Sequence, residues 1–125
     1  MSEASRVVLT VPALDEYART VRIAAAELAV RAEMSLDSVE DVRLAVEEAF
    51  VFARERVQGP SLTFTFTVEP GVVTLEVTPL AEAPADDSPD RGERYARFIL
   101  ESICDEFALI SGPGTCTLRI VKRSS

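Results

Sequence analysis

The chain has 125 residues, a formal net charge of −8 and 47% hydrophobic residues. This length fits one folded domain, residues 1–125, and the apolar content is too high for a disordered chain. The negative charge argues against direct binding to nucleic acid or to an anionic membrane. No apolar run approaches the roughly 18 residues of a membrane-spanning helix. We therefore expect a cytoplasmic protein whose partners are proteins.

Histidine is absent, and cysteine occurs only at Cys104 and Cys116. The chain therefore lacks the commonest general base and the commonest metal ligand, and we expect no metal site. Both cysteines lie among apolar neighbours, which favours buried, reduced thiols. The sequence alone leaves a disulfide between them open.

The first half of the chain predicts one strand and two helices. Residues 6–11 are a β-branched run that ends at Pro12, which is typical of a strand. Apolar residues recur every three or four positions over 13–31 and predict an amphipathic helix. A second helix is expected to start near Ser35 or Ser38, either of which can cap it, and to stop at residues 58–60. Its expected core stripe is Val39, Val42, Val46, Ala49, Ala53 and Val57.

The second half begins with the clearest local pattern. Residues 61–68 alternate between polar and apolar side chains, and the alternation resumes over 73–77 after the turn residues 69–71. This pattern predicts a β-hairpin with one buried face. Residues 79–91 are rich in Pro, Ala and Asp, and we expect them to form a loop.

A third helix is predicted over 92–104, followed by strands at 106–110 and 116–122 that flank a turn at 112–114. One face of this helix is expected to carry Tyr95, Phe98, Ile99 and Ile103. The resulting order, β-α-α-β-β-α-β-β, predicts an α+β sandwich. We expect a mostly antiparallel mixed sheet of about five strands, with three helices on one face.

This order, together with Asp-Val-Arg-Leu-Ala-Val-Glu-Glu-Ala at 41–49, resembles the GHKL (histidine-kinase-like) ATPase superfamily. Within it, the chain is most similar to the anti-sigma-factor serine kinases. Residues 15–19, 105–107 and 111–122 resemble that family's first helix, its closing helix–strand junction and its final hairpin. The resemblance spans nearly the whole chain, and it implies a single histidine-kinase-like ATPase domain over residues 1–125.

The same resemblance implies that the nucleotide site is degenerate. Family members hold magnesium with an asparagine on the second helix, and they hold ATP with an Asp-x-Gly-x-Gly and a Gly-x-Gly motif. The residues at these positions here are Phe52, Pro79, Ala81, Ala83, Arg94 and Ala96. Phenylalanine has no oxygen for magnesium, and an alanine methyl group blocks the close backbone approach that glycine allows. We therefore expect ATP and magnesium binding to be lost, with Phe52 either filling the vacated cavity or serving as an ordinary core aromatic.

Three further residues take a possible role from the resemblance. Glu48 matches the family's general base, a catalytic role that it has only if the kinase is active. Otherwise it is an acidic residue on a helix face. Arg19 matches the arginine through which the family contacts its partners, and Arg22 lies one turn further along the helix. The alternative is that both arginines are simply solvated.

These observations lead to a first hypothesis and two alternatives. The first is an anti-sigma-factor-like regulator that binds a sigma factor or its anti-anti-sigma protein without ATP, with homodimer formation expected by analogy alone. One alternative is an active serine/threonine-protein kinase that phosphorylates an anti-anti-sigma factor. The other is a dimerisation partner for an intact paralogue.

Overall fold

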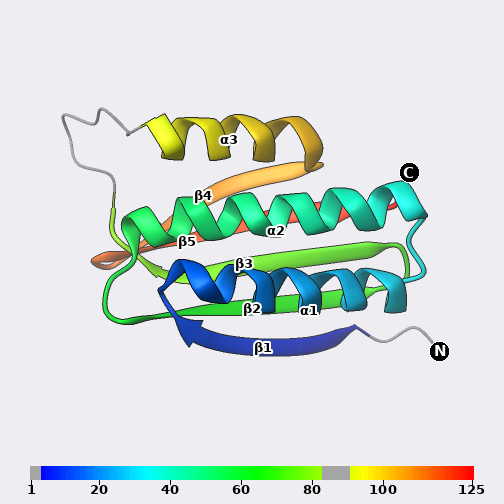
Figure 1. The fold of residues 1–125 in the computed structure, drawn as a ribbon, viewed down its shortest axis with the longest axis horizontal. Helices are drawn as coiled ribbons and strands as arrows, with labels where there is room; N and C mark the ends of the chain where they lie inside the picture. Colours follow the sequence, from blue (N-terminus) through cyan, green and yellow to red (C-terminus); the bar gives the residue numbers. More distant parts are fainter. Residues whose placement is uncertain (1–3, 83–90) are drawn as a thin grey trace.

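The computed structural model describes residues 4–82 and 91–125 (Figure 1). Its strands are β1 (Ser5–Pro12), β2 (Ser61–Glu69), β3 (Val72–Leu80), β4 (Glu106–Gly112) and β5 (Thr115–Arg123). Its α-helices are α1 (Ala18–Arg31), α2 (Leu36–Arg56) and α3 (Arg91–Ile103). The order of these elements is the predicted one.

The five strands form one sheet in the order β1-β2-β3-β5-β4. All four pairings between neighbouring strands are antiparallel. The predicted α+β class and the five strands are confirmed, whereas the expected mixed character of the sheet is wrong for the described strands. The β2–β3 and β4–β5 pairings are hairpins, whereas β1 and β2 are linked through α1 and α2, and β3 and β5 through α3 and β4.

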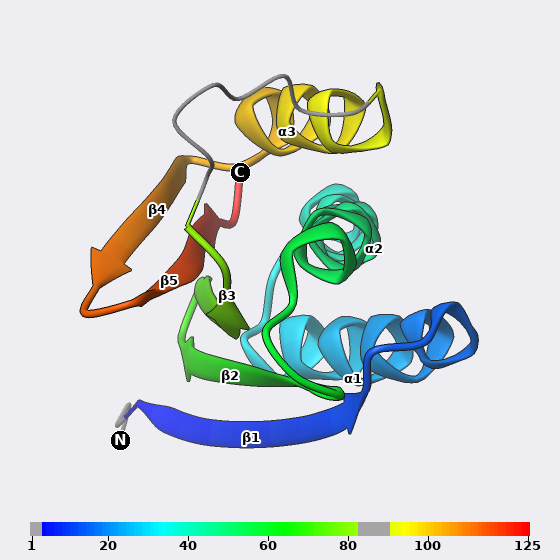
Figure 2. The ribbon, with the colours of Figure 1, turned by 90° about the vertical axis from the view of Figure 1, so that its left-hand side faces the viewer.

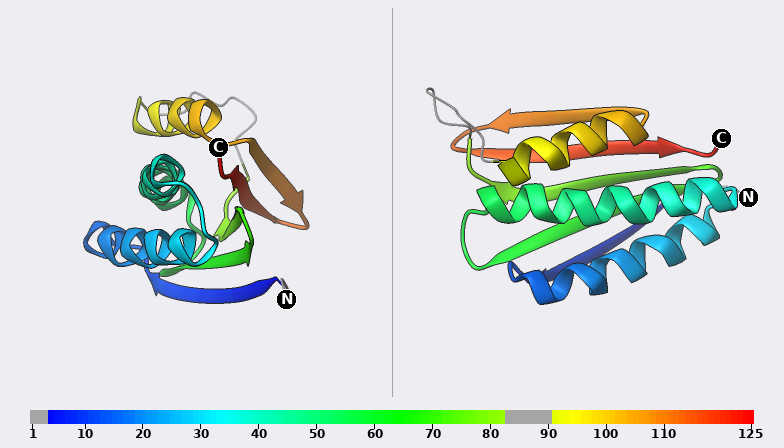
Figure 3. Two further views of the ribbon diagram at one scale, coloured as in Figure 1. Left: turned by 90° about the vertical axis from the view of Figure 1, so that its right-hand side faces the viewer. Right: turned by 45° about the horizontal axis from the view of Figure 1, so that its top comes forward.

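The three helices lie side by side on one face of the sheet, with α2 between α1 and α3 (Figure 2). Helix α1 packs on β2 and β3, α2 packs on β3 and β5, and α3 packs on β4. Figure 3 shows α3 alongside the β4–β5 hairpin. No described helix covers the opposite face of the sheet. The threonine side chains of β2 lie on this face.

The core lies between this sheet and the helix layer. The strict alternation of β2 and β3 places Phe64, Phe66, Leu75 and Val77 on the buried side, as the hairpin pattern predicted. Phe50 of α2 stacks on Phe64, with ring centroids 5.8 Å apart and planes inclined by 2°. Phe50 lies outside the predicted core stripe, so the buried face of α2 is wider than its valines and alanines indicated.

Helix α2 begins at a cluster of serine residues. Ser35 is the N-cap, because its hydroxyl accepts the Ser38 backbone N–H at 3.2 Å. Ser38 lies inside the helix and is buried. Ser124 accepts the Ser35 backbone N–H at 2.9 Å, and the Ser125 backbone N–H donates to the Ser38 hydroxyl at 3.0 Å. The cap is therefore Ser35, and residues after β5 complete it.

Three predicted boundaries are corrected. The first helix starts with a short 3-10 helix, Asp15–Tyr17 (η1), and only then continues as α1, which leaves Leu14 exposed. The predicted loop over 79–91 begins too early, because Pro79 and Leu80 belong to β3. It also ends too late, because α3 starts at Arg91. Residues 83–90 lie outside the described part of the chain.

The predicted apolar face of α3 is wrong for two of its four members. Ile99 and Ile103 are half-buried beside Ala96 and Leu100, whereas Tyr95 and Phe98 are exposed. At 100° per residue, Phe98 lies about 200° around the helix from Ala96. It therefore points to solvent when Ala96 points to α2. The apolar side chains of the helix span an arc of about 200°, wider than its contact with α2, and tertiary packing selects which of them are buried.

Candidate functional site

Phe52, Pro79, Ala81 and Ala96, four of the residues that the resemblance assigned to nucleotide binding, lie at the seam between α2, the end of β3 and α3. Phe52 of α2 is 0% exposed in this seam. Its ring makes an edge-to-face contact with Phe107 of β4, with centroids 6.2 Å apart and an interplanar angle of 87°. Aromatic pairs favour this arrangement. A buried aromatic side chain therefore occupies the position that the resemblance assigned to magnesium.

An ion pair closes the same seam from the C-terminal end of α2. The Arg56 guanidinium lies over the Phe52 ring, 5.1 Å from its centroid, and its Nε donates to the carboxylate of Glu93 in α3. Their side chains are only 10% and 9% exposed. The cation thus contacts an aromatic face and a carboxylate at once, and each stabilises its charge away from water. These contacts hold the first turn of α3 against the last turn of α2.

The end of β3 is joined to the end of α2 by backbone hydrogen bonds. The Gln58 N–H donates to the Pro79 carbonyl at 3.0 Å, and the Ala81 N–H donates to the Arg56 carbonyl at 2.6 Å. Val57 and Leu80 form an isolated antiparallel bridge between them. The backbone that the resemblance assigned to adenine recognition therefore bonds to the protein itself at Pro79 and Ala81. The remaining predicted position, Ala83, lies outside the described residues.

The last pair of predicted positions lies within α3 rather than in a loop before it. Arg94 is exposed, and Ala96 is buried at the contact with α2. The Ala96 backbone N–H lies inside the helix and is bonded to a helix carbonyl, so it is unable to cradle a phosphate as the free N–H groups of a helix N-terminus do. Together with Phe52, which offers no oxygen ligand, this arrangement does not fit magnesium-bound ATP.

Glu48 precedes Phe52 by one helical turn and is half-buried. Burial raises the pKa of its carboxyl above the ordinary value, and the neighbouring Glu47 carboxylate raises it further. A raised pKa makes the carboxylate a better proton acceptor. The structure thus provides a carboxylate suited to general-base chemistry next to a seam that does not fit a phosphoryl donor.

The two predicted partner-binding arginines lie on α1, on the other side of α2 from Phe52. Arg19 is exposed. Arg22 forms an ion pair with Glu47 of α2 at 3.3 Å. The structure therefore does not bring them together with the Phe52 seam, and Arg22 already has a role in linking α1 to α2.

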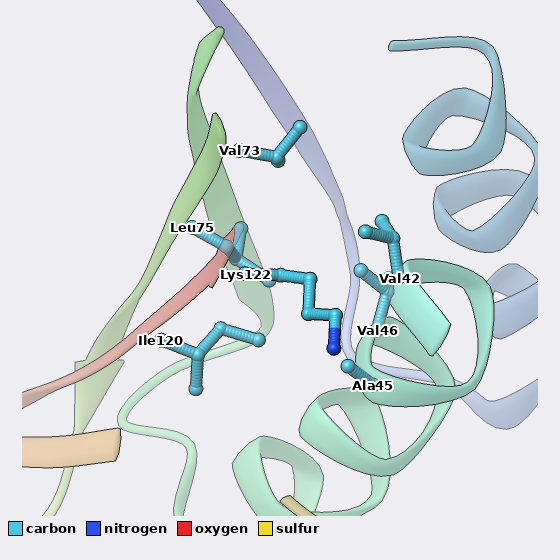
Figure 4. Close-up of a pocket in the computed structure, with 7 residues that line it drawn as sticks. All are labelled: Val42, Ala45, Val46, Val73, Leu75, Ile120 and Lys122. Carbon is cyan, nitrogen blue, oxygen red and sulfur yellow. The ribbon is translucent and has the colours of Figure 1, made fainter. Parts of the chain in front are cut away.

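A small cavity lies between α2 and the sheet (Figure 4). It is lined by Val42, Ala45, Val46, Val73, Leu75, Ile120 and Lys122. Its volume is about 10 Å³, which is room for about one water molecule. The Lys122 stem crosses it, and the ammonium group bonds to the Ile103 carbonyl at 2.9 Å and pairs with Asp41 at 3.1 Å. This cavity is too small for a nucleotide.

Both cysteines are free thiols, which answers the question of a disulfide that the sequence left open. Burial raises the pKa of Cys104 to about 12, so the thiol is unreactive at neutral pH.

Within 4–82 and 91–125, no group of three or more cysteine and carboxylate side chains is placed to hold a metal ion. No helix in the same ranges is both long enough and apolar enough to cross a bilayer.

Sequence reasoning missed the Arg56–Glu93 pair and the exposure of Tyr95 and Phe98. The pair joins residues 37 positions apart, beyond the reach of any helical spacing rule. The exposure of Phe98 had one available signal, namely that it follows Arg94 by four residues and so shares a helix face with a charged side chain. Searches with the sequence found no matching family model and no matching curated protein.

Proposed function

We propose that this chain is an anti-sigma-factor-like regulatory protein of the histidine-kinase-like ATPase type that binds a sigma factor or its anti-anti-sigma protein without ATP. The α+β architecture, with three helices on one face of an antiparallel sheet, is compatible with that fold. The partner class rests on the resemblance of residues 15–19, 41–49 and 105–122 to anti-sigma-factor serine kinases. Binding would act by covering a sigma-factor surface that RNA polymerase needs.

One observation carries the independence from ATP. Phe52 is fully buried beneath Arg56, and Arg56 is paired with Glu93 of α3. To admit a nucleotide, the seam would have to expel an aromatic side chain and break a nearly buried ion pair. Each of these changes costs several kcal/mol, about 3 or more. Binding to a partner through a surface requires neither change.

Isothermal titration with Mg-ATP tests this proposal directly. We expect no saturable heat with the wild-type chain, and none with the Phe52→Asn variant, because restoring one ligand leaves the rest of the seam filled. Binding of Mg-ATP by the wild-type chain with micromolar affinity would refute the independence from ATP.

The partner class requires a second experiment. The purified chain is used as bait in its native cytoplasmic extract, with and without enzymatic depletion of ATP, and the captured proteins are identified by mass spectrometry. We expect a sigma factor or a small anti-anti-sigma protein in both samples, and less of it with Arg19→Glu. Capture of metabolic enzymes alone would contradict the proposal.

The raised pKa of Glu48 favours one alternative function, an active serine kinase. Phosphoryl transfer needs a bound donor as well as a base. If the chain is a kinase, labelled phosphate passes from ATP to a co-purified antagonist, and Glu48→Ala abolishes the transfer. Under the proposed function, we expect no labelling of the antagonist with the wild-type chain or with Glu48→Ala.

A further inference from the structure

Helix α3 stands at one end of the helix layer, with α2 on one side and no described helix on the other (Figure 2). Its buried side chains, Ala96 and Leu100, point to α2. At 100° per residue, Phe98 lies on the opposite side of the helix. Phe98 is 65% exposed, more than any other phenylalanine of the chain. The side of α3 that faces away from α2 therefore presents a large apolar side chain to solvent.

Two side chains of opposite charge flank Phe98 on this side of the helix. Arg94 precedes it by four residues and Glu101 follows it by three, and the three positions fall within an arc of about 60°. Both charged residues are exposed. Arg94 forms no ion pair with a residue of the described ranges, and Glu101 approaches Arg97 only at 3.7 Å. We call Arg94, Tyr95, Phe98 and Glu101 the outer face of α3.

The outer face is neutral as a whole. Arg97 lies outside it, because its guanidinium is placed over the Phe107 ring of β4, 5.4 Å from the centroid. Tyr95, on the other side of Phe98, is 60% exposed and uncharged. The face therefore favours neither an acidic nor a basic partner. What it does specify is an order of charges along the helix, with the positive charge before Phe98 and the negative charge after it.

We propose that the outer face of α3 binds the outer face of a second copy of the chain, with the two helices antiparallel about a two-fold axis. Phe98 then lies against its own copy at the centre of the contact. Arg94 lies about 6 Å before Phe98 along the helix axis, and Glu101 lies about 4.5 Å after it. The Arg94 of each copy therefore comes within reach of the Glu101 of the other, and the contact contains two ion pairs.

Symmetry is the reason that a second copy fits this face. A two-fold contact uses the same patch on both subunits, so the patch has to be complementary to itself. Antiparallel pairing reverses the order of the charges, and it places each positive charge of the outer face opposite a negative one. The contact involves one helix of 13 residues on each copy. It is therefore smaller than a standard interface of roughly 1,600 Å², and the dimer should dissociate on dilution.

The other end of the helix layer meets this requirement less well. Helix α1 exposes Ile23 and Val30, at 56% and 62%, and it also has no described helix on its outer side (Figure 2). Its Glu27, however, is bonded to Arg31 of the same helix at 2.6 Å. That carboxylate already has its partner within the chain. The inference about α3 concerns assembly, and it holds whichever protein the chain regulates.

Sedimentation equilibrium of the full chain at several concentrations tests the proposal. We expect a monomer–dimer equilibrium for wild type. Arg94→Glu and Glu101→Arg should each raise the dissociation constant at least about tenfold, because each places like charges opposite each other twice in the dimer. Phe98→Ser should have a similar effect, because it removes both rings at the centre. The matched control is Ile23→Ser on α1, which should leave the dissociation constant unchanged.

A mixture of the two charge variants gives the sharpest result. Arg94→Glu and Glu101→Arg, each weakly associating alone, should form a 1:1 heterodimer when mixed, because opposite charges then meet at both ion-pair positions. The double variant Arg94→Glu/Glu101→Arg should recover the wild-type dissociation constant for the same reason. A role of either residue within its own chain predicts neither the heterodimer nor the recovery.

The proposal is overturned if wild type stays monomeric at every concentration, or if its dimer is unaffected by Arg94→Glu and Phe98→Ser. A dimer that Ile23→Ser dissociates would assign the contact to α1 instead. Failure of the two charge variants to associate when mixed would contradict the antiparallel pairing of Arg94 with Glu101. Circular dichroism confirms that each variant is folded before association is compared.

Discussion

The ion pair between Arg56 and Glu93 should dominate the attachment of α3 to α2. Glu93→Gln keeps the shape of the side chain and one oxygen, but removes the negative charge that the Arg56 Nε contacts. Removal of one partner from a buried ion pair typically costs 3–5 kcal/mol. The Phe52 ring still faces the guanidinium and relieves part of this cost. We therefore expect Glu93→Gln to lower the free energy of unfolding by about 3 kcal/mol.

The double variant Arg56→Met/Glu93→Leu provides a sharper signature. It replaces both charges by apolar side chains of similar volume, an exchange that is often neutral or stabilising for buried pairs. We expect the double variant to be more stable than Glu93→Gln and more stable than Arg56→Met. A chain of 125 residues has a stability of about 10 kcal/mol, so all of these variants remain folded.

Urea unfolding followed by circular dichroism at neutral pH measures these differences. The matched control is Glu27→Gln, which breaks the exposed pair between Arg31 and Glu27 at 2.6 Å and should cost less than about 0.5 kcal/mol. The reasoning is refuted if Glu93→Gln costs no more than this control. It is also refuted if the costs of Arg56→Met and Glu93→Leu simply add in the double variant.

Three further outcomes are expected from urea unfolding. Ser35→Ala should lower the free energy of unfolding by about 1 kcal/mol through loss of the N-cap of α2. The control Thr20→Ala, at an exposed position of α1, should lower it by less than about 0.5 kcal/mol. Equal losses for the two variants would contradict the capping role of Ser35. Phe52→Ala should cost 3–5 kcal/mol, about the range for a buried aromatic, and a cost below about 1 would show that the seam is loosely packed. Because folding raises the pKa of Glu48, protonated Glu48 favours the folded state and this stability is lost as the pH rises through the raised pKa. Glu48→Gln should therefore be more stable than wild type at about pH 7, and this difference in stability should vanish near pH 3. A difference that stays constant with pH would contradict the raised pKa of Glu48.

The sheet and the order of elements followed from sequence patterns because those patterns are strong and local. Alternation over residues 61–68 fixed which side of β2 is buried, since a shift by one residue would expose Phe64 and Phe66. The glycines at 71 and 114 have positive φ in the two hairpin turns, as the turn patterns anticipated. Each of these features depends on only a few neighbouring residues.

The contents of the candidate site were predictable only in part. That Phe52 offers no oxygen to a metal ion was visible in the sequence, because it concerns the chemistry of one side chain. The contacts that close the seam were not, since the pairing of Arg56 with Glu93 depends on how α3 docks on α2. The same docking decides that Ala96 is buried and Phe98 is exposed. Such choices depend on tertiary packing, which helical periodicity does not specify when the apolar arc of a helix is wider than its buried face.

The position of β3 has a consequence for synthesis on the ribosome. This strand lies in the middle of the sheet, yet its second neighbour, β5, is translated only after α3 and β4. While the nascent chain waits for β5, one side of β3 presents unpaired backbone N–H and C=O groups, and such an edge recruits other chains. Translation that stalls ahead of β5 should therefore leave an aggregation-prone fragment that depends on chaperones to stay in solution.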